Sequence, residues 1–284
     1  MTMKTTAIAT IAAATLAGPA FAAAHAGTMG YALAEDGATL VTMADIAAPG
    51  EVQTFALETP LRAIAYRPVT GQLLGFADGT IYDIDATTGA LTDLGATFAD
   101  DAMIGEGAVA FDFNNQIDAV RLVGEDGANL VYFPEGFGDA DERANSVLRF
   151  TDAFYLDGDA NAGTTPAIFA NAYTNAIPGA TAESTAQYAI DAGTDALVTL
   201  ANNAGELATV GALTLDGEPV DVTAMGGFDI VSATEGDDMA YAVLQTEGSE
   251  TAGLYLVDLT SGALTNLADL GMGGFTGFAA SKGM

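Results

Sequence analysis

The chain has 284 residues, of which 38 are acidic and 7 are basic, so its formal net charge is -31 at pH 7. Binding to nucleic acid needs clustered Lys and Arg that displace counterions from phosphates, so this composition excludes nucleic acid most strongly among the partner classes. The sequence contains no cysteine, which excludes disulfide bonds and thiol chemistry. Packing and backbone hydrogen bonds must therefore hold the fold together.

The first residues have the pattern of a secretory signal peptide. Lys4 precedes a run of small and apolar residues that ends at Gly18-Pro19, and the small-x-small triplet Ala20-Phe21-Ala22 follows. This pattern predicts a signal peptide over residues 1–22, with a second possible cleavage site after residue 26. A transmembrane anchor would need about 20 apolar residues, which this run does not reach. We expect an exported protein, periplasmic or extracellular, that does not insert into a membrane.

A ten-residue phrase recurs along the body of the chain. The segment Asp85–Leu94 returns as Asp258–Leu267 with seven of its ten positions identical. A third copy, Asp191–Leu200, keeps the initial Asp and the Ala-Leu step. Each copy follows a strand-like stretch with tyrosine at the same offset. A strand, a tight turn of Asp, Thr, Ser and Gly, and a second strand together predict a β-hairpin.

The spacing of the hairpins predicts the fold. With two weaker copies at Asp45 and Pro134, the turns begin 40, 49, 57 and 67 residues apart, which is the period of a propeller blade lengthened by loops. The sequence therefore predicts an all-β fold, a β-propeller of about five four-stranded blades, as one domain over residues 27–284. Six blades remain an alternative if residues 147–163 contain a degenerate unit, and a β-sandwich is a less favoured one.

The end of the chain suggests how the ring closes. The strand-like segment Gly274–Ala280 is not followed by a hairpin, so we expect it to complete the first unit. That pairing would join the N- and C-terminal strands and remove the exposed edge of an open array.

The sequence lacks most of the residues that common catalytic mechanisms need. The only histidine is His25, at the end of the leader, so catalysis by Ser-His-Asp or Cys-His and ordinary zinc sites lack their groups. We therefore expect a non-catalytic binding or scaffolding propeller whose ligand is a small molecule or a protein. A carboxylate-dependent glycan hydrolase stays an alternative, because glycoside hydrolysis needs two positioned acids.

One loop has the composition of a calcium site. Asp157, Asp159 and Asn161 alternate with small residues, and oxygen-bearing side chains at alternate positions of a tight loop can converge on Ca²⁺. The spacing of an EF-hand fails here, because Ala162 occupies the glycine position and Ile168 the glutamate position. A solvated turn is the other interpretation. A calcium-stabilised cell-surface or secreted protein is thus a third candidate function.

Arginine is scarce, which makes the position of Arg121 informative. It lies in the predicted strand 119–123, shortly before Asn129. Two interpretations are open. Arg121 lies at the central channel, where it binds an anionic group or pairs with Asp112, or it forms an ion pair that stabilises the third blade.

Several segments resemble one known family. Phe111–Asn114, Ile117–Val123 and Gly127–Leu130 resemble the core signature of an exported bacterial family known as a domain of unknown function, DUF4394. Gly158–Gly163 and Ala172–Asn175 resemble its later signature. The resemblance covers nearly the whole mature chain and implies a secreted, propeller-like domain without an assigned activity. It directs attention to the positions that match its motifs: Asp112, Asn114, Arg121, Asn129, Asp159 and Asn161. The first four are the candidates for ligand binding, and the last two belong to the candidate calcium loop.

Overall fold

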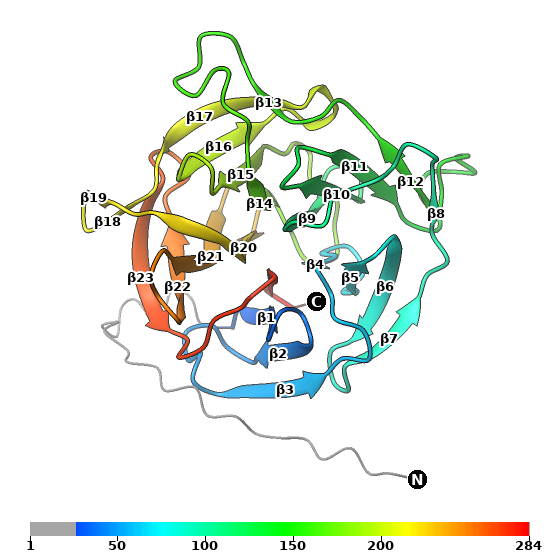
Figure 1. Cartoon of the computed structure of the whole chain (residues 1–284). Helices are drawn as coiled ribbons and strands as arrows, with labels where there is room; N and C mark the ends of the chain where they lie inside the picture. The colour runs from blue at the N-terminus through cyan, green and yellow to red at the C-terminus, as the bar shows by residue number, and fades with distance from the viewer. Residues whose placement is uncertain (1–26, 284) are drawn as a thin grey trace.

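The computed structural model describes residues 27–283, so the predicted signal peptide lies outside the described residues. Five sheets stand around a central axis, and the one helix of the described part is the 3-10 turn η1 (Asn202–Ala204). Figure 1 shows this ring of sheets, with the C-terminus beside β1. The predicted five-bladed propeller is confirmed. No helix within these residues is long and apolar enough to cross a membrane.

The five blades follow one another along the chain. From the axis outwards, blade one contains β24 (Gly277–Ser281), β1 (Met29–Ala34), β2 (Thr39–Met43) and β3 (Val52–Ala56). Blade two contains β4 (Ala63–Tyr66), β5 (Leu73–Ala77), β6 (Thr80–Asp85) and β7 (Ala90–Asp93). Blade three contains β9 (Val109–Asn114), β10 (Ala119–Gly124), β11 (Asn129–Phe133), β12 (Ser146–Arg149) and β8 (Thr97–Phe98).

The last two blades are the most extended. Blade four contains β14 (Ile168–Tyr173), β15 (Gln187–Asp191), β16 (Ala196–Leu200), β17 (Glu206–Ala212) and β13 (Phe154–Tyr155). Blade five contains β20 (Val222–Ser232), β21 (Asp238–Thr246), β22 (Ala252–Val257), β23 (Ala263–Asp269), β18 (Thr214–Leu215) and β19 (Glu218–Pro219).

The additional outer strands come from the segments that connect the blades. β8, β13 and β18 each pair in parallel with the outermost strand of the blade they lead into. They cover edges that would otherwise present unpaired backbone groups. Residues 147–163 contain no separate blade, because they contribute most of β12 to blade three and the whole of β13 to blade four. The alternative of a sixth blade in that stretch is therefore wrong.

The recurring phrase forms the predicted hairpins β6–β7, β15–β16 and β22–β23. Asp85 Oδ1 accepts a hydrogen bond from the Thr87 backbone N–H at 2.8 Å, and Asp258 Oδ1 accepts the matching bond from Thr260. Gly89 has φ +72°, a conformation that glycine adopts without steric cost. The recurrent Asp and Gly are turn residues.

The ring closes as the sequence predicts. β24 pairs antiparallel with β1, and Met29 lies opposite Ser281. The inner strands β24, β4, β9, β14 and β20 each pack against the next around the axis. Apolar clusters fill the spaces between neighbouring blades. The axis is thus surrounded by five inner strands, each of which has one edge without a ladder partner.

Close approach of two inner strands explains one glycine. A Cβ atom at Gly227 would lie 2.2 Å from the backbone nitrogen of Phe278, so any side chain would push β20 away from β24. We expect Gly227→Ala to lower the free energy of unfolding by about 2 kcal/mol or more. Urea unfolding followed by circular dichroism measures this. At the control Gly107, the three atoms nearest to such a Cβ belong to the side chain of Glu125 rather than to backbone, so Gly107→Ala should cost clearly less than Gly227→Ala. Equal effects of the two changes would contradict this account.

Candidate functional site

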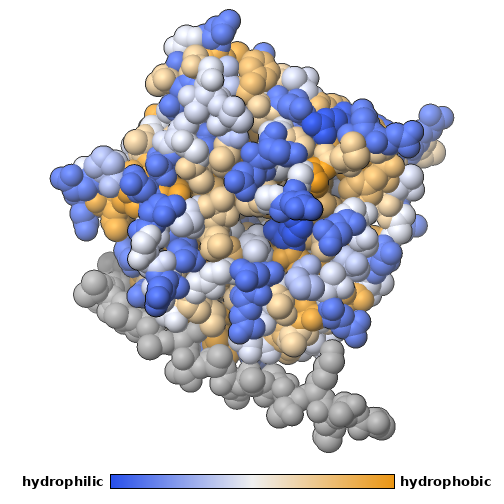
Figure 2. Space-filling view, viewed as in Figure 1, coloured by the Kyte–Doolittle hydropathy of each residue, from blue (hydrophilic) through white to orange (hydrophobic). Residues whose placement is uncertain are grey.

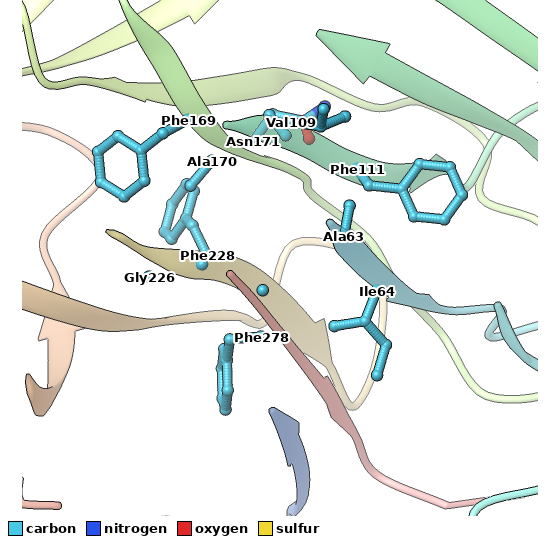
Figure 3. Close-up of a pocket in the computed structure, with 13 residues that line it drawn as sticks. Ala63, Ile64, Val109, Phe111, Phe169, Ala170, Asn171, Gly226, Phe228 and Phe278 are labelled. Atoms are coloured by element: carbon cyan, nitrogen blue, oxygen red, sulfur yellow. The ribbon is translucent and has the colours of Figure 1, made fainter. Parts of the chain in front are cut away.

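A small pocket opens on the axis at the beginning of the inner strands. Its empty volume is about 190 Å³, part of which is open to solvent, and it is lined by thirteen residues of all five blades. Figure 3 shows Ile64 and Phe278 on one side of the opening and Phe169, Asn171 and Phe111 on the other. Twelve of the lining residues are glycine or apolar, and Asn171 is the single polar one. Figure 2 shows that hydrophilic residues cover much of the face seen in Figure 1.

Asn171 lies on β14 and is 1% exposed. Neither its Oδ1 nor its Nδ2 atom has a hydrogen-bond partner among the described residues. A buried amide without partners costs about 1 to 3 kcal/mol, and most buried polar groups in folded proteins are satisfied. The side chain therefore keeps an unused donor group and an unused acceptor beside the pocket.

Two buried carboxylates lie one residue deeper along the axis, because Asp112 follows the lining residue Phe111 and Asp229 follows Phe228. The Tyr173 backbone N–H donates to Asp112 Oδ2 at 2.7 Å. The corresponding bond in blade five runs from the Ala280 N–H to Asp229 Oδ2 at 2.6 Å. Each carboxylate therefore connects its own inner strand to the free edge of the next one.

The surroundings of these carboxylates disfavour their charge. Burial raises the pKa of Asp229 to about 7, even though two backbone N–H groups donate to it. Burial also raises the pKa of Asp112 well above its ordinary value, and the nearby charge of Asp229 raises it further. None of the three ion pairs within residues 27–283 includes either carboxylate.

Arg121 lies between blades three and four and is 3% exposed. Its guanidinium donates to Tyr173 Oη at 3.2 Å, to Asn129 Oδ1 at 2.7 Å and to Asn203 Oδ1 at 2.8 Å. It also lies over the ring of Phe150, 5.7 Å from the centroid. These partners are neutral.

The expected ion pair between Arg121 and Asp112 is therefore wrong. The two residues lie opposite each other on β10 and β9, but the guanidinium is directed to the amides of Asn129 and Asn203 instead. A planar guanidinium has five N–H donors, and side-chain amide oxygens can also accept hydrogen bonds from them.

The other two predicted ligand-binding residues join the same interface. Asn129 Nδ2 donates to the backbone carbonyls of Thr151 and Asn202, at 2.8 and 2.9 Å. Asn114 Nδ2 donates to Asn202 Oδ1 at 3.4 Å. The helical turn η1, which carries Asn202, covers this cluster from blade four. The structure thus brings Asp112, Asn114, Arg121 and Asn129 together, in a network that connects two blades, and their role as ligand-binding residues stays a prediction.

The loop of the predicted calcium residues docks onto β17. Asp159 accepts hydrogen bonds from the backbone N–H and the hydroxyl of Thr209, both at 2.7 Å, and from the Asn161 N–H. These bonds lower the pKa of Asp159. Asp157 is exposed. No group of three or more His, Cys, Asp or Glu side chains arranged for a metal occurs among the described residues. The predicted calcium site at Asp157, Asp159 and Asn161 stays a prediction.

Comparison with protein families gives one match, a domain of unknown function, DUF4394, which matches residues 38–279. The chain belongs to this family. The resemblance seen in the sequence is thereby confirmed, and Asp112, Asn171, Arg121 and Asp229 all lie within the matched part of this DUF4394 domain. No curated protein matches the chain.

Solved structures similar to this DUF4394 protein include the hydrazine synthase of Kuenenia stuttgartiensis, with 13% identity and a TM-score of 0.33. The alignment covers 75% of this chain and 51% of the synthase chain. An auxiliary nutrient binding protein from Bacteroides ovatus has 12% identity and a TM-score of 0.41, and the alignment covers 75% of this chain and 55% of that one. This chain thus spans about half the length of each.

A further similar structure is a nidogen/laminin complex, with 11% identity, a TM-score of 0.44, and coverage of 90% of this chain and 99% of the other. At these similarities none of the three structures informs on the ligand of the DUF4394 domain.

Three residues of the axial region were not predicted as site residues: Asn171, Tyr173 and Asp229. A signal for Asp229 is present in the sequence, because the step Phe111-Asp112 of one inner strand recurs as Phe228-Asp229 in another. Alignment of the inner strands with each other would have placed the two carboxylates at the same level of the axis.

Proposed function

We propose that this DUF4394 domain is a non-catalytic binding propeller, exported to the periplasm or the cell exterior, that holds a small ligand in its axial pocket. The observation that supports this most is Asn171, a buried amide without partners beside a pocket that the edges of the five inner strands form. Concave sites with a few placed polar groups are typical of ligand sites. Part of the empty volume of about 190 Å³ is open solvent, so the enclosed space suits only a ligand of about the size of a water molecule or a bare ion.

The glycan hydrolase alternative finds no support in this geometry. Asp112 and Asp229 do not line the pocket, and each carboxylate accepts hydrogen bonds from backbone N–H groups. A sugar would have to reach past the lining residues to touch them. A substrate glycan is also larger than the pocket.

Replacing Asn171 by leucine tests the proposal, because a ligand site and a structural role predict opposite changes in the free energy of unfolding. In ligand-free protein, Asn171→Leu should leave the free energy of unfolding unchanged or raise it by up to about 2 kcal/mol, because it removes an amide without partners. The same change should abolish the rise in Tm caused by any compound that binds the pocket. The measurement is thermal unfolding of wild type and variant with a panel of small polar compounds and ions.

Asn129 supplies a matched control. It is also a fully buried asparagine, but its amide makes hydrogen bonds with three partners: Arg121, Thr151 and Asn202. Asn129→Leu should therefore destabilise the protein by about 2 to 4 kcal/mol. Equal destabilisation by Asn171→Leu and Asn129→Leu, or ligand-induced stabilisation that survives Asn171→Leu, would contradict a ligand site at Asn171.

A further inference from the structure

The charge of the chain is distributed unevenly around the ring. No Lys, Arg or His occurs between Arg149 and Lys282, a stretch that contains all of blades four and five. Aspartate and glutamate residues occur throughout the same stretch. A surface of one sign attracts partners of the opposite sign and repels those of its own sign. Blades four and five therefore favour a positively charged partner over a second copy of this acidic chain.

The rim of each blade ends in a strand with one unpaired edge, and these five strands are β3, β7, β8, β13 and β19. Such an edge can pair with another chain, and exposed apolar side chains beside it favour contact with a partner. The strands β3, β7, β8 and β19 expose no large apolar side chain. In β19, Pro219 also cannot donate to a further strand. The edge at β13 is the exception.

The segment around β13 exposes two apolar side chains. Phe154 is 43% exposed, and Leu156, directly after the strand, is 39% exposed. The side chain of Tyr155 between them is buried, and its hydroxyl contacts Asp191. Side chains two residues apart in an extended segment lie on the same face. Phe154 and Leu156 thus form one apolar surface beside β13, which Figure 1 shows at the rim of the ring.

The backbone of this segment has one side without a partner. The Phe154 N–H donates to the Gly205 carbonyl at 2.9 Å. The Leu156 N–H donates to the Leu207 carbonyl at 3.1 Å. Successive residues of a strand direct their N–H and C=O groups to opposite edges, so those of Tyr155 are directed away from β17. No strand of residues 27–283 lies on that side, so an extended chain can pair there.

The charges beside this surface are mostly acidic. Asp157, directly after the segment, is exposed and takes part in none of the three ion pairs of the described chain. Glu206 of β17 lies opposite Phe154. Asp152, on the other side, pairs with Arg149. The apolar surface is therefore flanked by carboxylates that complement Lys or Arg on a partner.

We propose that Phe154, Leu156 and the backbone of Tyr155 form a docking site for an extended, positively charged segment of another protein. The segment adds a short strand outside β13. Its apolar side chains contact Phe154 and Leu156, and Asp157 and Glu206 attract its Lys or Arg side chains. So small a contact gives transient binding that salt weakens. The site lies at the rim of blade four and the axial pocket at its inner strand, so this inference goes beyond the proposed function and does not rest on it.

The test is fluorescence anisotropy of a labelled peptide of about seven alternating lysine and valine residues, mixed with the purified protein. Wild type should bind this peptide, and its Kd should rise as NaCl is added. The double variant Phe154→Thr, Leu156→Thr should weaken binding by about tenfold or more, because threonine suits a strand but removes the apolar contact. Ile117→Thr is the matched control, because Ile117 is 45% exposed but lies on blade three, beside the ion pair of Arg67 and Asp118. It should bind as wild type does.

Two altered peptides test the charge and the strand pairing with wild-type protein alone. With glutamate in place of lysine, the peptide should bind about tenfold more weakly or less, because the surface repels it. Methylation of every second backbone amide, in either register, should weaken binding by a similar factor, because it blocks pairing with Tyr155. These two measurements stay decisive if the double variant fails to fold.

Three results would overturn the docking site. Equal binding of the lysine peptide to wild type and to the folded double variant would show attraction by the net charge alone. Equal binding of the methylated peptides in both registers would exclude strand addition at β13. A dimer of wild type in sedimentation that the double variant does not form would assign the surface to a second copy of this chain instead.

Discussion

Replacing Arg121 by methionine is expected to lower the free energy of unfolding by about 3 to 5 kcal/mol. Methionine keeps an apolar chain of similar length over the ring of Phe150 but removes all the N–H donors. The Oδ1 atom of the buried Asn129 then loses the donor 2.7 Å away. Blades three and four lose the bonds to Tyr173 and Asn203 that join them.

Urea unfolding followed by circular dichroism measures this effect. Arg143→Met is the control, because Arg143 is exposed, its ion pair is with Asp141 two residues away, and its guanidinium lies over the rings of Phe133 and Phe137 as that of Arg121 lies over Phe150. It should change stability by about 1 kcal/mol or less. Arg121→Lys should fall between the two, since one ammonium group cannot reach all three acceptors. A loss below about 1 kcal/mol for Arg121→Met would show that the network adds little to the joint between the blades.

The stability of the protein in chelator should fall between pH 5 and pH 8 because of Asp229. Its pKa is about 7 in the folded protein and near 3.8 in the unfolded chain. The folded state thus holds a proton that the unfolded state releases, and the resulting stabilisation disappears as the pH rises through 7. The expected loss is about 2 to 3 kcal/mol relative to Asp229→Asn, which cannot titrate.

Comparing how the stability of wild type and of Asp229→Asn depends on pH removes two contributions that do not come from the titration of Asp229. Asparagine can accept only one of the two N–H bonds that Asp229 accepts, but this cost is the same at both pH values. The general acidity of the chain affects wild type and variant alike. The pKa of Asp112 is also raised, by burial and by the charge of Asp229, and Asp112 is present in both proteins, so the profile of the variant should be flatter without being flat. Identical profiles would show that Asp229 is ionised throughout this range.

Much of the fold could be predicted from the sequence, because its signals are local and repeated. The turns at Asp85 and Asp258 are determined by side-chain bonds to the backbone two residues on, so the same phrase produces the same hairpin in two blades. Closure of the ring by the C-terminal strand could be predicted because the strand-like segment Gly274–Ala280 is not followed by a hairpin. The added outer strands β8, β13 and β18 have two residues each, too short to leave a pattern.

The candidate site was predicted less completely. Arg121 and Asn129 are eight residues apart and were found together, but Tyr173 and Asn203 come from the next blade, which no local pattern places. Asn171 follows a register shift between Ile168 and Ala170, so its strand does not align simply with the others. The ion pair expected for Arg121 failed because long-range amides supply its acceptors.

The pairing of β1 with β24 also determines the order in which the blades of this protein can assemble. Met29 and Ser281 lie opposite each other, so the first blade needs the last strand of the chain. A chain that emerges from its N-terminus can assemble blades two to five from consecutive residues, whereas β1 keeps an open edge until the final residues arrive. Closing so long a loop is entropically costly, and an open edge can pair with other chains in the meantime. Ring closure is therefore the late step of maturation, at which this propeller is most exposed to strand exchange between molecules.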